Sequence, residues 1–409
     1  MKKHVLALAA AGALLLATAA SFAPSTAVAE EFSKAVGEPL IAAQAAMKKN
    51  QWDLALAKAR EAAAVSSKKP HEEFAVNELL SYLYTRRGDY ASASKLQEAA
   101  LSSGRIPESQ VPARVKALAQ AYAQKGNINH AKQIEYGNRY LKSYPGDADM
   151  NFLVAQAQFQ NGDCRNAVRS AQNAADAARK AGASPKENWL NLKLNCQYKL
   201  DDEEGQLVTR EQLVRYYPKK ETWEPLLMAL SNQPETDDRA KMNIYRLMLE
   251  LGLLEKPDQY LEMAEIAIDQ EPGEAAKVIQ AGLDNKVLVG RDNDRAKRIL
   301  NHAQTKAQAT QTSLQAMDQK ARQDPKGEAD VSLGRAYLAS GQHDKAVEAL
   351  QRGLKKGGFK NVDEAQMMLG RAYLKLKQKD QARRAFNAVP DDSKLAQVAQ
   401  LWGVYATQS

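Results

Sequence analysis

Two arginines stand at the same place in identical hexapeptides. The sequence Leu-Gly-Arg-Ala-Tyr-Leu occupies residues 333–338 and returns at 369–374, so Arg335 and Arg371 are 36 residues apart. A guanidinium group binds a carboxylate through paired, charge-assisted hydrogen bonds. If both copies adopt one structure, the two arginines form a ladder for a carboxylate-bearing partner. Lys375 follows Arg371 by about one helical turn.

Motifs of the common catalytic and metal sites are missing from the sequence. The four histidines beyond residue 29 are far apart, and the two cysteines are too few for a zinc knuckle. There is no Gly-x-Ser-x-Gly elbow, phosphate-binding loop, Gly-x-Gly-x-x-Gly turn or calcium loop. We therefore expect no cofactor, no metal and no enzymatic activity. An enzyme of unrecognised type stays an alternative, because catalytic groups on a helical array need not form a linear motif.

The two arginines belong to a repeated unit. Identity between the copies continues at Gln342, Asp344 and Ala346, which return as Gln378, Asp380 and Ala382. A period of about 34 to 36 residues is typical of a helical hairpin stacked on itself. Gly334 stands where two helices must approach closely, and Gly341 where the first helix must end. The pattern therefore predicts an array of helical hairpins.

The unit resembles the tetratricopeptide repeat, whose first helix carries Leu-Gly and Tyr and whose second carries an Ala-rich pattern. Earlier copies fit the same frame at residues 36–69, 74–107, 112–145 and 148–185. Weaker copies follow at 186–220, 221–254 and 257–290, and residues 291–326 have helical periodicity without the signature. An Ala-rich helical bundle would explain the alanine coincidences but not the ordered pattern of the copies.

The resemblance implies an all-α superhelix, or solenoid, of about nine helical hairpins with a C-terminal capping helix. We expect an N-terminal array at 36–220, divergent helical hairpins at 221–326, a C-terminal repeat pair at 327–392 and the capping helix at 393–409. Residues 232–238 (Asn-Gln-Pro-Glu-Thr-Asp-Asp) predict a loop in which Thr236 or Asp237 caps the next helix.

The first 29 residues have the pattern of a cleavable signal peptide. Lys2 and Lys3 precede an apolar stretch, and Ala27-Val28-Ala29 matches a small-x-small cleavage site. This pattern favours a periplasmic protein, with no transmembrane segment in the mature chain. Removal of residues 1–29 would lower the net charge from +8 to +6, which is mild. The lysine-rich C-terminal end favours a solvated face or acidic partners and does not indicate nucleic acid.

Cys164 and Cys196 are the only cysteines, and an oxidising compartment permits a disulfide between them. In the repeat frame, Cys164 begins a second helix and Cys196 lies near the end of the next first helix. These helices are antiparallel neighbours, so a bond is sterically allowed. Two buried thiols are the alternative.

In proteins of this kind the first helices of successive hairpins line a concave groove, where the resemblance places partner contacts. The exposed first-helix positions of the N-terminal copies are Tyr82, Arg86, Lys116, Gln120, Gln124, Phe152, Gln156, Phe159 and Gln160, and those of the C-terminal pair are Arg335, Arg371 and Lys375. Aromatic rings with amides suit an extended peptide or a polysaccharide strand.

These features predict a non-catalytic periplasmic scaffold that binds protein partners in cell-envelope assembly or secretion. The alternative is a binder of peptidoglycan or exopolysaccharide within an export or wall-processing system.

Overall fold

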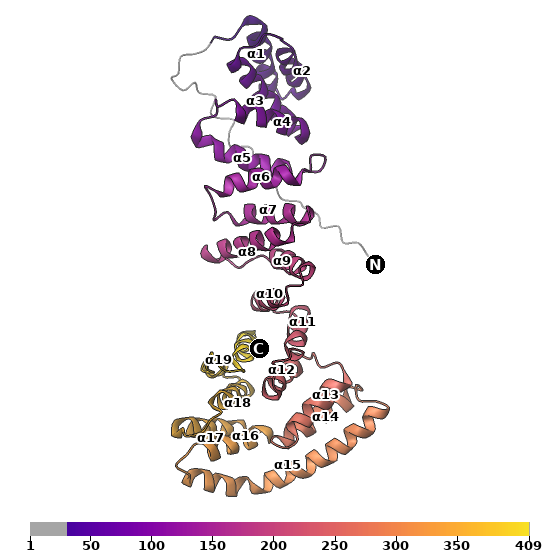
Figure 1. Ribbon diagram of the computed structural model, residues 1–409, viewed down its shortest axis with the longest axis vertical. Helices are drawn as coiled ribbons and strands as arrows, with labels where there is room; N and C mark the ends of the chain where they lie inside the picture. The colour runs from indigo at the N-terminus through magenta and orange to yellow at the C-terminus, as the bar shows by residue number, and fades with distance from the viewer. Residues whose placement is uncertain (1–30, 409) are drawn as a thin grey trace. The chain divides into compact units, whose positions relative to one another are not determined.

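The computed structural model describes residues 31–408, and this part of the chain is built from helices with no β-strand. The predicted signal peptide at 1–29 lies outside the described residues. Between residues 31 and 408, no helix combines the length and the apolar character that a bilayer crossing needs. The predicted all-α class is therefore confirmed (Figure 1).

The chain divides into two compact units, Met1–Ala177 and Ala178–Ser409. The described part of the N-terminal unit has four hairpins, the last of which extends three residues past the boundary: α1 (Lys34–Lys48) with α2 (Trp52–Ala63), α3 (Pro70–Arg86) with α4 (Tyr90–Ser102), α5 (Val111–Ala121) with α6 (His130–Leu141), and α7 (Ala148–Gln160) with α8 (Cys164–Lys180). A short 3-10 turn, η1 (Glu108–Gln110), precedes α5.

Five more hairpins belong to the described part of the C-terminal unit: α9 (Glu187–Lys199) with α10 (Glu203–Tyr216), α11 (Lys220–Ser231) with α12 (Asp238–Glu250), α13 (Pro257–Ala267) with α14 (Pro272–Asp284), α16 (Glu328–Ala339) with α17 (His343–Lys356), and α18 (Val362–Lys375) with α19 (Lys379–Asn387). The helix α15 (Arg291–Gln323) stands alone between the third and fourth pairs, and α20 (Ala396–Gln408) ends the chain.

The turns inside the hairpins follow from local chemistry. A glycine with positive φ follows the first helix in several copies, as at Gly88 (76°), Gly162 (81°) and Gly341 (81°), because a side chain would strain that backbone. Aspartate often begins the next helix. The carboxylate of Asp237 accepts a hydrogen bond from the backbone N–H of Ala240 at 2.9 Å, so the cap predicted for α12 is confirmed.

Small residues let the two helices of a hairpin pack closely. A Cβ atom added at Gly334 would lie 2.5 Å from Cγ of Leu350, and one added at Gly370 would lie 2.4 Å from Cε1 of Phe386. Leu350 and Phe386 are buried in the core of the C-terminal unit. The Leu-Gly pair of the repeated hexapeptide therefore has a packing role, as the sequence predicts.

Residues 291–323 form one helix of 33 residues in place of a further hairpin. This segment contains no glycine and no proline, so nothing in its sequence ends the helix. Residues facing the neighbouring helices recur at alternating spacings of four and three, which keeps one side of a long helix against its neighbours. They are Ala296, Leu300, Ala303, Ala307, Thr310, Leu314, Met317 and Ala321.

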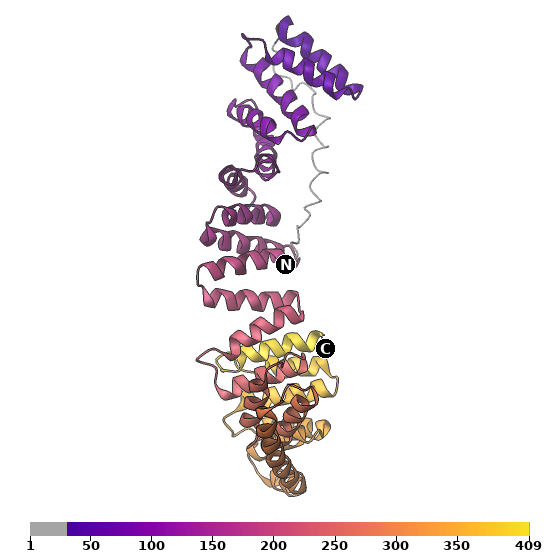
Figure 2. The same ribbon diagram turned by 90° about the vertical axis from the view of Figure 1, so that its right-hand side faces the viewer.

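The last helix packs against both α19 and α12. Trp402 of α20 is 2% exposed, stacks on Phe386 with ring centroids 5.6 Å apart, and donates its indole N–H to the backbone oxygen of Asn243 at 3.1 Å. Figures 1 and 2 both show the end of the chain beside α12. Residues more than 150 positions apart in the sequence thus meet within the C-terminal unit.

Candidate functional site

The first helices of successive hairpins are joined directly by ion pairs. In the N-terminal unit, the Arg114 guanidinium of α5 donates two hydrogen bonds to the Glu78 carboxylate of α3, at 3.0 and 2.5 Å. In the C-terminal unit, Arg335 of α16 pairs with Glu364 of α18 at 2.9 Å. Within each unit these helices therefore lie side by side and share one face, which we call the first-helix face.

Several predicted residues on the N-terminal first-helix face stay accessible. Tyr82 is 37% exposed, and Gln120 and Gln160 are also exposed. Arg86 is exposed too, although its guanidinium lies 3.9 Å from the ring centroid of Trp52 in a cation–π contact. Three consecutive first helices, α3, α5 and α7, therefore each present a polar or aromatic side chain to solvent.

Lys116 has an internal partner. Its ammonium group lies 2.6 Å from the carboxylate of Asp147, the residue that caps α7. Burial lowers the pKa of Lys116, but the hydrogen bond and charge of Asp147 outweigh this and hold the pKa above its ordinary value. Gln124 follows the end of α5, and its side-chain amide donates to the backbone oxygen of Gln120 at 3.3 Å. The contact of Lys116 joins α5 to the start of α7, whereas that of Gln124 is local.

The aromatic residues of α7 are less accessible than the N-terminal glutamines. Phe152 is 8% exposed, whereas Phe159 and Gln156 are half-buried. Burial of an aromatic ring stabilises the array and leaves little of its surface for a ligand. The role of Phe152 in binding a partner stays a prediction.

Both cysteines are buried, Cys164 at the start of α8 and Cys196 near the end of α9. They belong to different compact units. The proposed disulfide stays a prediction, and labelling of the denatured chain would test it, since two reactive sulfurs per chain would exclude the bond.

A buried ionic cluster in the C-terminal unit joins two second helices, α12 and α14, to the first helix α18. Arg246 of α12 lies 2.6 Å from Glu271, which precedes α14, and 2.6 Å from Glu274 in its first turn. Arg371 of α18 lies 3.1 Å from the same Glu274 and 4.0 Å from Glu271. Two arginines therefore share two carboxylates, and this network joins α12, α14 and α18.

Burial acts to raise the pKa of both carboxylates, but the net shifts are opposite. It raises the pKa of Glu271 to about 6, because the nearby Arg246 only partly offsets the loss of hydration and Glu274 adds repulsion. Burial also acts to raise the pKa of Glu274, but the charges of Arg246 and Arg371 outweigh it and hold the pKa far below its ordinary value. Glu274 therefore carries the negative charge that both arginines need.

A pocket of about 330 Å³ borders this cluster. Arg371 and His343 line it with Lys277 and Lys375, beside the apolar side chains of Leu374 and Trp402. Within the described residues, Nη1 of Arg371 and Nδ1 of His343 are buried without a hydrogen-bond partner. Burial, together with the charges of Lys277 and Lys375, lowers the pKa of His343. The arrangement suits a small anionic group attached to an apolar body.

The three C-terminal residues predicted to bind a partner are all engaged inside the unit. Arg335 also donates a hydrogen bond to Gln270, and Lys375 donates one to Glu250 of α12. The repeat pattern therefore indicates Arg371 and Lys375 of this pocket, but neither Arg335, which lies outside it, nor the partners of these residues. Arg246, Lys277 and Trp402 carry no repeated motif, and only their place in the fold brings them to the pocket.

Comparison with known proteins identifies the repeated unit. A model of the tetratricopeptide repeat matches residues 331–395, which include both Leu-Gly-Arg-Ala-Tyr-Leu sequences. No curated protein matches the sequence at a significant level.

Solved structures similar to this chain include tetratricopeptide repeat proteins. For MamA (residues 41 to the end) from Desulfovibrio magneticus, identity is 12%, the TM-score is 0.31, and the match covers 45% of this chain and 94% of the other. A tetratricopeptide repeat protein from Parabacteroides merdae is 13% identical with a TM-score of 0.32. That match covers 66% of this chain and 100% of the other. The C-terminal part of a repeat-containing protein from Cytophaga hutchinsonii is 13% identical with a TM-score of 0.30. That match covers 87% of this chain and 97% of the other.

The doubled hexapeptide, the paired helices around its small residues and the match at 331–395 agree with one another. Residues 331–395 therefore belong to the tetratricopeptide repeat family.

Proposed function

We propose that this protein is a non-catalytic scaffold of the bacterial cell envelope, located in the periplasm, and that it binds protein partners through its first-helix face. One observation carries the proposal. Three consecutive first helices expose polar or aromatic side chains, namely Tyr82 on α3, Gln120 on α5 and Gln160 on α7. A row of amides and a phenol at successive repeats can pair with the backbone of an extended peptide.

The C-terminal unit by itself offers a cationic contact for a partner. Arg371 and Lys375 line the pocket of about 330 Å³, and a carboxylate of the partner would bind beside them. Because Glu274 already neutralises much of the charge of Arg371, we expect this contact to orient the partner more than to strengthen its binding.

Site-specific photo-crosslinking in cells tests the proposal. A benzophenone amino acid replaces Tyr82, Gln120, Gln160 or Lys375 on the first helices. Matched controls carry it at Lys95 of α4, Glu135 of α6 and Arg165 of α8, which are exposed positions on second helices. We expect a discrete protein adduct from the first-helix positions, recovered in the periplasmic fraction.

Adducts of equal yield at the second-helix positions would contradict the proposed binding face. Recovery of the protein in the cytoplasmic fraction would contradict its location. An adduct that is a polysaccharide instead of a protein would favour the alternative function, a binder of peptidoglycan or exopolysaccharide.

A further inference from the structure

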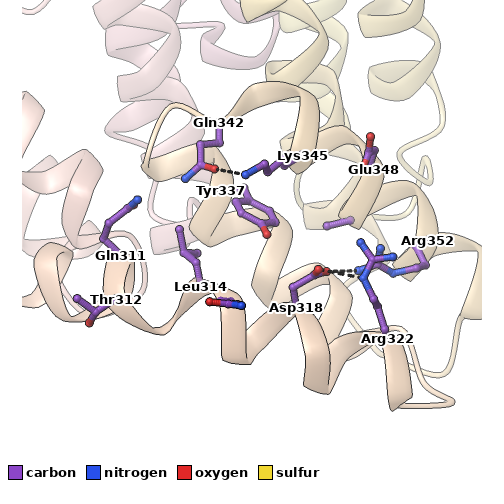
Figure 3. A pocket seen from close by; sticks show the side chains of 12 residues that line it. Gln311, Thr312, Leu314, Asp318, Arg322, Tyr337, Gln342, Lys345, Glu348 and Arg352 are labelled. Atoms are coloured by element: carbon purple, nitrogen blue, oxygen red, sulfur yellow. Dashed lines mark hydrogen bonds and ion pairs between the residues drawn. The ribbon is translucent and has the colours of Figure 1, made fainter.

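A second pocket lies where α15 passes the α16–α17 hairpin, and its volume is about 480 Å³ (Figure 3). Its apolar floor comes from Leu314, Tyr337 and Ala349, all of which are buried. The long α15 creates this pocket, because its C-terminal half continues alongside the hairpin where a repeat would have turned back. The partner-binding residues predicted from the repeat do not include any residue of this site.

The cationic groups around this pocket already have acceptors. Asp318 accepts from Arg322 at 2.9 Å and pairs with Arg352 at 3.2 Å, and Figure 3 shows these three side chains together. Lys345 donates to the side-chain oxygen of Gln342 at 2.9 Å. An anionic ligand would have to compete with Asp318 for Arg322 and Arg352, and the Glu348 carboxylate would repel it.

Four polar side chains of the pocket have no hydrogen bond in the described part of the chain. They are the amides of Gln311 and Gln315, the carboxylate of Glu348 and the hydroxyl of Tyr337. The glutamines and Glu348 are exposed. Together these groups offer both donors and acceptors around an apolar floor.

We propose that this pocket binds one or two uncharged sugar units of a glycan. Sugar hydroxyls donate to the Glu348 carboxylate and accept from the amide N–H groups of Gln311 and Gln315. The C–H face of the ring lies over the small accessible parts of Leu314 and Tyr337, which are 6% and 8% exposed. The pocket volume is within the range of about 300 to 1,000 Å³ that holds small ligands. A short peptide would bring its terminal carboxylate beside Arg322 and Arg352, which Asp318 already pairs.

Calorimetric titration of the full chain tests this site. The probes are cellobiose and N,N′-diacetylchitobiose, with digalacturonate as the anionic comparator and trialanine as the peptide comparator. The site variant Gln311→Ala/Gln315→Ala removes two amides from exposed positions of α15. The matched control, Gln304→Ala/Gln308→Ala, removes two exposed glutamines with the same spacing from the same helix, outside the pocket.

We expect at least one neutral disaccharide to bind more tightly than either comparator. The site variant should weaken its binding about tenfold, the cost of two hydrogen bonds, whereas the control variant binds as the unmodified protein does. Thermal melting of both variants checks that they fold equally well, because alanine favours a helix at these positions. Three outcomes would each overturn the proposal: no heat of binding with either neutral sugar, equal weakening in the two variants, or tighter binding of trialanine.

Discussion

Protonation of Glu271 is linked to the folded state. This residue is buried beside Glu274, and its pKa rises from an ordinary value of 4.5 to about 6. The folded protein therefore holds this proton more strongly than the unfolded chain does. Protonated Glu271 therefore adds to the free energy of unfolding below pH 4.5, and this contribution is lost as the pH rises through about 6. Glu274 has the opposite effect. Because its pKa is lowered, its ionised form stabilises the folded state, and this contribution is lost as the pH falls below 4.5.

Glu271→Gln removes the group that ionises while it keeps the size of the side chain. Relative to the unmodified protein, we expect the free energy of unfolding of the variant to increase between pH 4.5 and 7, by about 2 kcal/mol for a pKa shift of this size. Chemical denaturation at several pH values measures the difference. The exposed control Glu224→Gln should show no such trend, and a flat difference for Glu271→Gln would contradict the raised pKa.

At the scale of the element, two helical glycines of the C-terminal unit have opposite expected effects. A Cβ atom at Gly370 of α18 would lie 2.4 Å from a ring atom of Phe386, whereas one at Gly403 of α20 would meet nothing nearer than Asn387 at 3.6 Å. Gly370→Ala should therefore destabilise the protein by about 1 to 3 kcal/mol through overpacking. Gly403→Ala should stabilise it by about 1 kcal/mol, because alanine favours a helix.

Urea denaturation of the two variants compares these effects, and each variant is the control for the other. If Gly370→Ala were neutral or stabilising, the helices α18 and α19 would not be in the close contact that the repeat requires. If Gly403→Ala were as destabilising as Gly370→Ala, the space beside α20 would be smaller than the structure shows.

The elements differ in how far the sequence predicts them. The hairpin α16–α17 follows from Gly334, Gly341 and the spacing of the copies, because small residues and helix stops act locally. The sequence predicts divergent hairpins at 221–326, yet α15 in this segment is a single long helix. Alanine-rich sequence with helical periodicity fits one long helix or two short ones, and only packing against α14 and α16 selects between them.

At the scale of the whole molecule, the structure separates two compact units with different means of holding their repeats. The described hairpins of the N-terminal unit are linked neighbour to neighbour, as by Arg114 and Glu78. The C-terminal unit adds contacts between distant repeats, since Trp402 bonds to Asn243 of α12 and Arg371 to Glu274 of α14. Its stability therefore depends on elements that are far apart in the sequence.

Trp402→Ala should weaken the packing of α20 against both α12 and α19. We expect a loss of about 3 to 5 kcal/mol from the removed ring, and faster hydrogen exchange in α12 as well as in α19. Trp402→Phe keeps a ring against Phe386 but loses the hydrogen bond to Asn243, so a smaller effect is expected. Faster exchange in α19 alone would show that α20 caps its own repeat without holding α12.

The sequence alone determined the class of the protein, because the signals of a helical repeat are local: a small residue at a close approach, a glycine after the first helix, a fixed period. For the same reason it placed Arg335 and Arg371 at equivalent positions. Tertiary structure decided what those arginines contact, since Glu274 lies 97 residues from Arg371 and Glu250 lies 125 residues from Lys375. The repeat motif reflects only contacts between adjacent helices. These pairs join distant helices, because the C-terminal unit places α18 beside α12 and α14.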